Sequence, residues 1–223
     1  MNVSAKAAFF RVEGALIRPA AVPAPAFLTA NAKGAAGAPL ARLGGAALAA
    51  GLRLAAPLRD QPATHRLAWM GLRGADAERL TGLSAEYYAR HLLPGLKPAA
   101  RALLDEARRL GFRIVLLSDD LDLVVAPLQA LLGADELLAN RMEILDGRAT
   151  GRLLDPLIGA APSGQWLRGL AAERGLDLAR SRAYAALHAD ALLLSAVGHP
   201  CAVDPDWRLR RLAMDQDWPI VHT

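Results

Sequence analysis

Residues able to do chemistry occur first around an apolar run near the start of the chain. The run "AAFFRV" (7–12) contains Arg11 and leads into Glu13 and Gly14. A carboxylate can act as a nucleophile or exchange protons, whereas a guanidinium stays protonated and only donates hydrogen bonds. Arg11 therefore cannot attack an electrophile, while Glu13 keeps partial competence as an acid or base.

A second polar group follows the apolar run "FRIVLLS" (112–118). Ser118 ends this run, and three aspartates follow it, Asp119, Asp120 and Asp122. Their carboxylates could hold a metal ion near Ser118. Helix capping after a strand explains at least one of them more simply.

A third group follows "SRAYAAL" (181–187) and contains His188 and Asp190. His188 could act as an acid or base near neutral pH. A lone histidine is more often a surface residue or a hydrogen-bonded core residue, and this simpler interpretation is the one we favour.

The elements that must position these side chains alternate along the chain between short apolar runs and amphipathic stretches. This alternation predicts an α/β fold with a parallel sheet. Strands are expected at 7–12, 112–118, 181–187, 199–203 and 218–221. They lack polar alternation, as central strands covered on both faces do.

The ends of two helices between the strands can be recognised. "KPAARALLDEARRLG" has Pro98 in its first turn and ends at Gly111. "SGQWLRGLAAERG" can be capped by Ser163 and ends at Gly175. Proline at the beginning and glycine at the end are typical of helix termini.

Two segments depart from this alternation. Residues 19–94 hold no convincing strand and predict an all-helical insertion, the cap. In "NRMEILDGRATGRLL" (140–154), Asp146 and Gly147 between short apolar runs predict a β-hairpin.

Within the cap, the segment from 40 to 58 is about as long as a membrane-spanning helix. Arg42 and Arg53 interrupt it, and alanine and glycine dominate it. A packed helical segment is therefore favoured over a span, and peripheral membrane contact stays open.

Composition indicates a folded globular protein. The chain has 223 residues, of which 53% are hydrophobic and 22% charged, and a net charge of +4. The arginines are scattered with no basic run, so nucleic acid is an unlikely partner. The single cysteine, Cys201, excludes an intrachain disulfide, and no signal-peptide pattern opens the sequence, so we expect a cytoplasmic protein.

Four further residues have simple structural interpretations. Trp166, Trp207 and Trp218 have apolar neighbours and are expected in the core or as interface anchors. Cys201, in "HPCAV", is expected to be a buried strand residue.

Three long stretches of the chain resemble a known family. They are "YYARHLLPGLKPAARALLDEARRLGFRIVLLSDDLDLVVAPLQALLG", "NRMEILDGRATGRLL" and "AVGHPCAVDPDWRLRRLAMDQDWPIV". They resemble the haloacid dehalogenase superfamily, in particular its phosphoserine-phosphatase-like branch. The resemblance implies a Rossmann-like core domain of residues 1–18 and 95–223, with a helical cap at 19–94.

In that family a D-x-D-G-T motif ends the first strand. Its first aspartate becomes an aspartyl-phosphate, its second is the general acid and base, and magnesium neutralises the phosphoryl oxygens. The resemblance places Arg11, Glu13, Gly14 and Ala15 at these positions. An arginine here can neither form the phosphoenzyme nor bind a cation.

The other motifs of the family are also altered. Ser118 matches the serine or threonine that binds the phosphoryl group. The lysine expected near 163–165 is absent, since no lysine follows Lys97. In the G-D-x-x-x-D motif the first metal-binding aspartate is Ala186 and the second is Asp190.

These combined losses predict a pseudo-phosphatase that acts as a binding, regulatory or assembly component, with another protein or a larger assembly as partner. No catalytic residue and no cofactor is then expected. The vestigial positions are Arg11, Glu13, Ser118 and Asp190.

Arg11 has two interpretations. It could bind an anionic ligand together with Ser118, or it could pair with Glu13 or Asp190 and fill the position of the family's active site (the old site). We favour the ion pair, because a buried charge needs a partner.

Two rivals for the whole protein remain. The first is a divergent phosphomonoester hydrolase that uses Glu13, Asp190 and either Asp119 or Asp120. Only in this case is magnesium expected, with Glu13, Asp190 and Asp119 as candidate ligands. The second rival is a membrane-peripheral accessory subunit docked through the cap.

Overall fold

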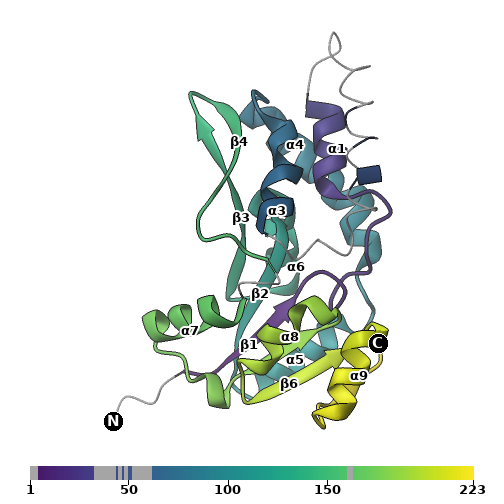
Figure 1. Cartoon of the computed structure of the whole chain (residues 1–223), viewed down its shortest axis with the longest axis vertical. Helices are drawn as coiled ribbons and strands as arrows, with labels where there is room; N and C mark the ends of the chain where they lie inside the picture. The colour runs from purple at the N-terminus through teal and green to yellow at the C-terminus, as the bar shows by residue number, and fades with distance from the viewer. Residues whose placement is uncertain (1–4, 33–43, 45–46, 48–49, 52–61, 160–162) are drawn as a thin grey trace.

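The computed structural model describes residues 5–32, 44, 47, 50–51, 62–159 and 163–223, with backbone only at 62–65 and 163–165. Seven strands form one sheet in the order β4-β3-β2-β1-β5-β6-β7 (Figure 1). The strands are β1 (Ala7–Arg11), β2 (Arg113–Leu121), β3 (Glu136–Leu145), β4 (Arg148–Leu154), β5 (Arg182–Ala185), β6 (His199–Val203) and β7 (Ile220–Val221). All neighbouring pairs are parallel except β3 and β4. The predicted α/β fold with a mostly parallel sheet is confirmed.

Helices cover both faces of this sheet. The helices are α1 (Ala24–Ala32), α3 (Pro62–Trp69), α4 (Ala77–Tyr87), α5 (Ala100–Arg109), α6 (Asp122–Leu132), α7 (Ser163–Arg174), α8 (Ala191–Ser195) and α9 (Trp207–Asp215). Short turns of other helix types are η3 (Met70–Leu72), η4 (Tyr88–Leu92), η5 (Leu93–Gly95), η6 (Leu178–Arg180) and η7 (His188–Asp190).

The first strand divides the core into two halves. Its side chains alternate between the faces of the sheet, as strand geometry requires. Ala8 and Phe10 pack in the cluster that includes α5 and α6, and Ala7 and Phe9 pack in the cluster that includes α7, α8 and α9. Because β1 is buried on both faces, its position at the centre of the sheet is firmly defined.

The predicted hairpin is confirmed, but it belongs to a longer element. Asp146 and Gly147 have positive φ angles of 48° and 73°, as the tight turns of hairpins require. The first strand of the hairpin, β3, begins at Glu136, before the predicted start at residue 140, and this unpredicted part pairs in parallel with β2. The hairpin therefore continues the main sheet upward beside α3 and α4 (Figure 1).

Between β1 and β2, the described residues form helices and no strand. This agrees with the helical character predicted there, while the domain boundaries at 18/19 and 94/95 stay a prediction. Most of the apolar segment 40–58 lies outside the described residues. In the part of the chain that is described, no helix is long and apolar enough to cross a membrane.

Candidate functional site

The candidate site lies where the carboxyl ends of three parallel strands meet. β1 lies between β2 and β5 in the sheet, so the residues that end these strands are neighbours. β1 contributes Arg11 and the following Glu13, β2 contributes Ser118 and Asp119, and η7 after β5 contributes Asp190. The carboxyl ends of parallel strands are the usual location of ligand sites in such sheets.

Arg11 is the centre of this site and is almost completely buried, with 2% of the residue exposed. Its Nη2 lies 2.6 Å from Oδ1 of Asp119 and 3.4 Å from Oε2 of Glu13. Its Nε lies 2.9 Å from Oδ1 of Asp190, which is 1% exposed. One guanidinium thus bridges carboxylates from three separate segments of the chain.

The predicted pairing of Arg11 with Glu13 or Asp190 is confirmed for both. The nearest partner, Asp119, was not predicted. β2 extends to Leu121, so Asp119 and Asp120 lie in the strand, and the residue before α6 makes no side-chain cap. Asp122, the first residue of α6, accepts from the neighbouring Leu123 N–H at 2.7 Å, and the residue at the cap position is Leu121. The prediction that at least one of the three aspartates caps a helix was therefore wrong.

Glu13 and Ser118 form a second part of the network. The Ser118 hydroxyl donates to Oε1 of Glu13 at 2.5 Å, and the backbone N–H of Asp119 donates to the same oxygen at 3.2 Å. The Ser118 oxygen in turn accepts from the Asp120 N–H at 3.1 Å. Ser118, the predicted anion-binding hydroxyl, is therefore engaged with a carboxylate, which would repel an anion.

The charges of the site shift two pKa values. Burial opposes the positive charge of Arg11, but Asp119, Asp190 and Glu13 together raise the Arg11 pKa above its ordinary value. Burial also raises the pKa of Glu13, the nearby Asp119 raises it further, and Arg11 offsets only part of the effect. Arg11 thus stays charged, and Glu13 resists ionisation.

Little space remains beside the guanidinium. A small cavity of about 10 Å³ lies there. Apart from Arg11 and Asp190 it is lined by Leu117, Leu157, Ile158, Gly159, Trp166 and Leu193. Such a volume is at the lower limit for one water molecule, and the walls are largely apolar.

One residue of the site carried no recognisable signal in the sequence. Asn140 on β3 is fully buried and donates to the carbonyl oxygens of Asp119 at 2.6 Å and Ile158 at 2.9 Å. Its own amide oxygen accepts from the Ile158 N–H at 2.9 Å. Asn140 thereby fixes the backbone of Asp119, the closest partner of Arg11, against the loop that walls the cavity.

The helices between β1 and β2 also reach the site. Tyr87, at the end of α4, donates from its hydroxyl to the carbonyl of Val22 at 2.8 Å. Burial, followed by the charges of Asp120 and Glu13, raises the Tyr87 pKa. Tyr87 therefore stays a neutral phenol within electrostatic reach of Asp120 and Glu13.

The magnesium site that the family resemblance implies does not fit these residues. Ala186 supplies no oxygen ligand from its side chain, and the guanidinium of Arg11 lies against Asp119 and Asp190. Among the described residues, no group of three histidine, cysteine, aspartate or glutamate side chains is arranged to hold a metal ion. A divalent cation would meet a fixed positive charge in place of a ligand.

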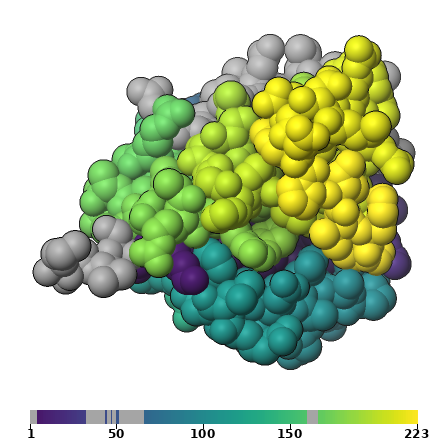
Figure 2. Space-filling view, turned by 90° about the horizontal axis from the view of Figure 1, so that it is seen from below, coloured from purple at the N-terminus to yellow at the C-terminus, as the bar shows by residue number. Residues whose placement is uncertain are grey.

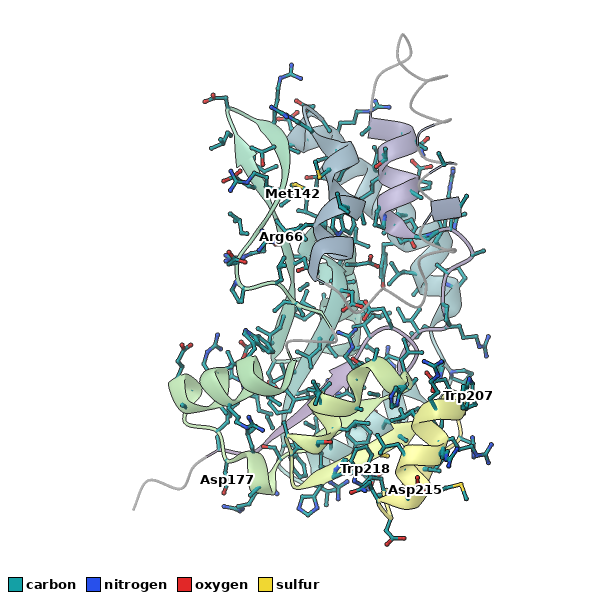
Figure 3. All side chains as sticks on the ribbon, viewed as in Figure 1. Arg66, Met142, Asp177, Trp207, Asp215 and Trp218 are labelled. Atoms are coloured by element: carbon teal, nitrogen blue, oxygen red, sulfur yellow. The ribbon has the colours of Figure 1, made fainter. Side chains whose placement is uncertain are left out.

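Other predicted residues lie apart from this cluster. His188 is exposed, and its backbone N–H donates to Asp206, the N-cap of α9. Trp207, the first residue of α9, is 71% exposed (Figure 3), so it does not lie in the core, and its alternative role as an interface anchor stays a prediction. Cys201 is buried on β6 as predicted.

Trp166, Trp218 and the position of the missing lysine are the remaining predicted features. Trp166 and Trp218 are partly buried and pack against the cluster formed with α7, α8 and α9, as expected for core residues. The position of the missing lysine, at 163–165, falls on residues whose side chains lie outside the described part of the chain.

The sequence of the chain is similar to those of known proteins. The family model described as "haloacid dehalogenase-like hydrolase" matches residues 8–195. The chain is 35% identical over 67% of its length to the "Inhibition of morphological differentiation protein" of Streptomyces azureus, covering 54% of that protein. It is 30% identical over 72% of its length to "Phosphoserine phosphatase SerB1" of Mycobacterium tuberculosis, covering 52% of it. The chain thus spans about half the length of these relatives.

Solved structures share its fold. A protein of unknown function from Bordetella pertussis Tohama I superposes with a TM-score of 0.76 at 22% identity, covering 98% of this chain and 99% of that one. A phosphoserine phosphatase in a phospho-aspartyl intermediate analogue state gives 0.68 at 15% identity, covering 99% and 94%. The chain belongs to the haloacid dehalogenase-like hydrolase family, in its phosphoserine-phosphatase-like branch.

Proposed function

We propose that this protein has lost aspartyl-phosphate chemistry and acts as a binding, regulatory or assembly component. The observation that carries the proposal is Arg11, whose guanidinium fills the place of the family's nucleophile and pairs with Asp119 and Asp190. An arginine cannot be phosphorylated through this mechanism, and loss of a nucleophile typically cripples an enzyme of this kind.

The surroundings of Arg11 support the same proposal. The cavity beside it measures about 10 Å³, which is too small for a phosphoryl group. Ser118 is hydrogen-bonded to Glu13, so a phosphate would have to displace a carboxylate to reach it. Substrate entry would require rearrangement of a buried ion-pair network.

The rival proposal is a divergent hydrolase of phosphomonoesters. The names of relatives such as the phosphoserine phosphatase of Mycobacterium tuberculosis favour it. So does Glu13, because a carboxylate with a raised pKa is suited to acid-base catalysis. In this rival, Asp119 would be the candidate nucleophile, since it is the carboxylate closest to Arg11.

An activity assay separates the two proposals. The purified protein is assayed with phosphoserine, p-nitrophenyl phosphate and a panel of other phosphomonoesters, with and without magnesium. We expect no turnover and no thermal stabilisation by beryllium fluoride with magnesium, which mimics the phosphoenzyme. Turnover that Asp119→Asn or Asp190→Ala abolishes would establish the hydrolase instead.

We also propose a cytoplasmic location and a protein partner, both of which rest on the sequence. The alternative is a peripheral membrane role through the segment 40–58. Flotation with vesicles containing anionic lipids tests this alternative. Recovery with the vesicles would favour the membrane role, and its absence, together with a defined complex on native purification, would favour the protein partner.

A further inference from the structure

A second, larger cavity lies away from Arg11, toward the amino ends of β5 and β6. This cleft, the Arg182 cleft, has a volume of about 610 Å³. Its walls come from α5, β5, β6, the end of α8 with the residues after it, and the segment that follows α9. Figure 2 shows the residues of α5 (teal) beside the C-terminal residues (yellow), with a furrow between them.

The cleft exists because β7 is short. Only Ala202 and Val203 of β6 pair with β7, so the first half of β6 is not covered by a strand. Pro200 there has no N–H to offer, which makes this edge unsuited to adding another strand. The residues from Gln216 to Pro219 line the cleft beside this part of β6, and the Pro219 carbonyl accepts from the Ala202 N–H at 2.9 Å.

Arg182 is the cation of this cleft. In the described part of the chain, no carboxylate lies within ion-pair distance of its guanidinium, whereas Arg113 at the start of β2 pairs with Glu136 at 3.2 Å. The hydrogen bond of Arg182 is a long one, from Nη1 to the Tyr184 hydroxyl at 3.4 Å. A half-buried guanidinium with five N–H donors is thus left with most of its hydrogen-bonding capacity unused by described residues.

The remaining walls combine apolar surface with a few polar groups. Leu103, Val197, Trp218 and Pro219 provide the apolar part, and Trp218 is partly buried next to α9 (Figure 3). A cleft of several hundred Å³ with apolar walls and a few convergent polar groups is the usual form of a small-molecule site.

Two carboxylates at the cleft limit the charge of a ligand. Glu106 and Asp217 line it and are exposed. They would repel a polyanion, while one negative charge can be matched by Arg182. Because a guanidinium binds carboxylates in a planar, two-point geometry, a carboxylate is the best match for this single cation.

We propose that the Arg182 cleft binds a small monocarboxylate with an apolar or aromatic body. The carboxylate pairs with Arg182, and the body packs between Trp218 and the α5 side of the cleft. This site is independent of the proposal for Arg11, because no residue lines both cavities.

The probes that test this proposal are benzoate, benzamide and phenyl phosphate, titrated by calorimetry and by ¹⁵N NMR of arginine Nε–H groups. Benzoate should bind and shift the Arg182 signal. Benzamide lacks the negative charge, and phenyl phosphate carries more than one. Each should bind at least tenfold more weakly than benzoate. Equal binding of benzamide, or no binding of benzoate, would overturn the proposal.

Variants locate the site. Arg182→Gln should raise the Kd for benzoate at least tenfold, with Arg182→Lys in between. Arg180→Gln is the matched control, since Arg180 is exposed on η6 and does not line the cleft. Far-UV circular dichroism checks that each variant is folded. If folded Arg182→Gln binds benzoate as the wild type does, the proposal is wrong.

Discussion

At the scale of single residues, the decisive feature is one buried cation among three carboxylates. Arg11 and Asp190 are shielded from water, while the side chains of Glu13 and Asp119 are each 21% exposed. Removing one partner of a buried ion pair is costly because an uncompensated charge remains. Arg11 should therefore stabilise the fold at the position where it replaces the nucleophile.

Arg11→Ala should lower the free energy of unfolding by about 3–5 kcal/mol, because three carboxylates would lose their shared partner. Denaturant melts measure this change. Arg211→Ala is the control, since Arg211 is exposed on α9. Arg79, which also looks like a surface residue in the sequence, is less suitable because its guanidinium binds the Asn31 carbonyl at 2.7 Å.

Arg11→Asp should be more destabilised than Arg11→Ala in the absence of metal, since it adds a fourth carboxylate. Millimolar magnesium should recover part of this loss in Arg11→Asp and have no effect on the wild type. A neutral or stabilising Arg11→Ala would show instead that the arginine is held for an anionic ligand.

Glu13 makes stability depend on pH. Burial raises its pKa in the folded state above the ordinary value of 4.5, so the folded state holds its proton to a higher pH than the unfolded state. The stability from neutral Glu13 is full below about pH 4.5 and is lost as pH rises through the raised pKa. Glu13→Gln should remove this loss.

The measurement is the free energy of unfolding of wild type and Glu13→Gln between pH 4 and pH 9. The free energy of unfolding of Glu13→Gln should rise relative to that of the wild type as pH rises. The reason is that glutamine can still accept from Ser118 and does not ionise. Parallel pH profiles for the two proteins would contradict the raised pKa.

At the scale of elements, the sheet sets the site and the helices close it. α4 carries Tyr87 to within electrostatic reach of the site's carboxylates and is capped by Asp76, which accepts from the Arg79 N–H at 2.9 Å. Gly82 lies in the interior of this helix, and a Cβ added there would meet no atom within 4 Å. No neighbouring atom requires a glycine at this position, so Gly82 weakens the helix without any benefit to packing.

Gly82→Ala should raise the free energy of unfolding by about 0.5–1 kcal/mol, since alanine loses less backbone entropy in a helix. Thermal or denaturant melts detect this gain. Gly198→Ala provides the contrast, because its Cβ would lie 1.8 Å from the Ala179 carbonyl oxygen and should destabilise the protein. No gain from Gly82→Ala would mean that α4 is not helical at this residue.

At the scale of the whole molecule, one aspartate joins segments far apart in the chain. Asp204, after β6, accepts from Lys97 Nζ at 2.8 Å and from the backbone N–H of Thr223 at 3.1 Å. Lys97 is 8% exposed. Asp204 thus ties the segment before α5 to the last residues described.

Asp204→Asn should cost about 1–3 kcal/mol of unfolding free energy at pH 7, because the shielded Lys97 loses its charged acceptor. Partial burial opposes ionisation of Asp204, but its hydrogen bonds from Lys97 and Thr223 dominate and lower its pKa. The contribution of Asp204 is therefore present above its ordinary pKa of 3.8 and is lost as pH falls through the lowered pKa.

Denaturant melts of wild type and Asp204→Asn at pH 7 and at pH 3 measure this contribution. Asp215→Asn, exposed at the end of α9 (Figure 3), is the control. A difference between wild type and Asp204→Asn that stays constant as the pH is lowered would show that Asp204 is not ionised in this pair.

The sequence by itself determined the fold class, the family and the losses at the old site. Apolar runs separated by capped helices predict a parallel sheet, because only buried strands tolerate such runs. Arg11 and Ala186 differ from the family's residues in chemical type, so these losses could be recognised without coordinates.

Only the tertiary structure decided which residues surround Arg11. Asp119 is 108 residues away along the chain and becomes its nearest partner because β1 and β2 are neighbours in the sheet. The expectation that one of Asp119, Asp120 and Asp122 caps a helix failed because no local pattern indicates that β2 continues to Leu121. The roles of Asn140 and of the Arg182 cleft were also hidden. A buried amide, and a guanidinium that forms no ion pair with the described residues, are defined by their neighbours in space, which a local sequence pattern does not contain.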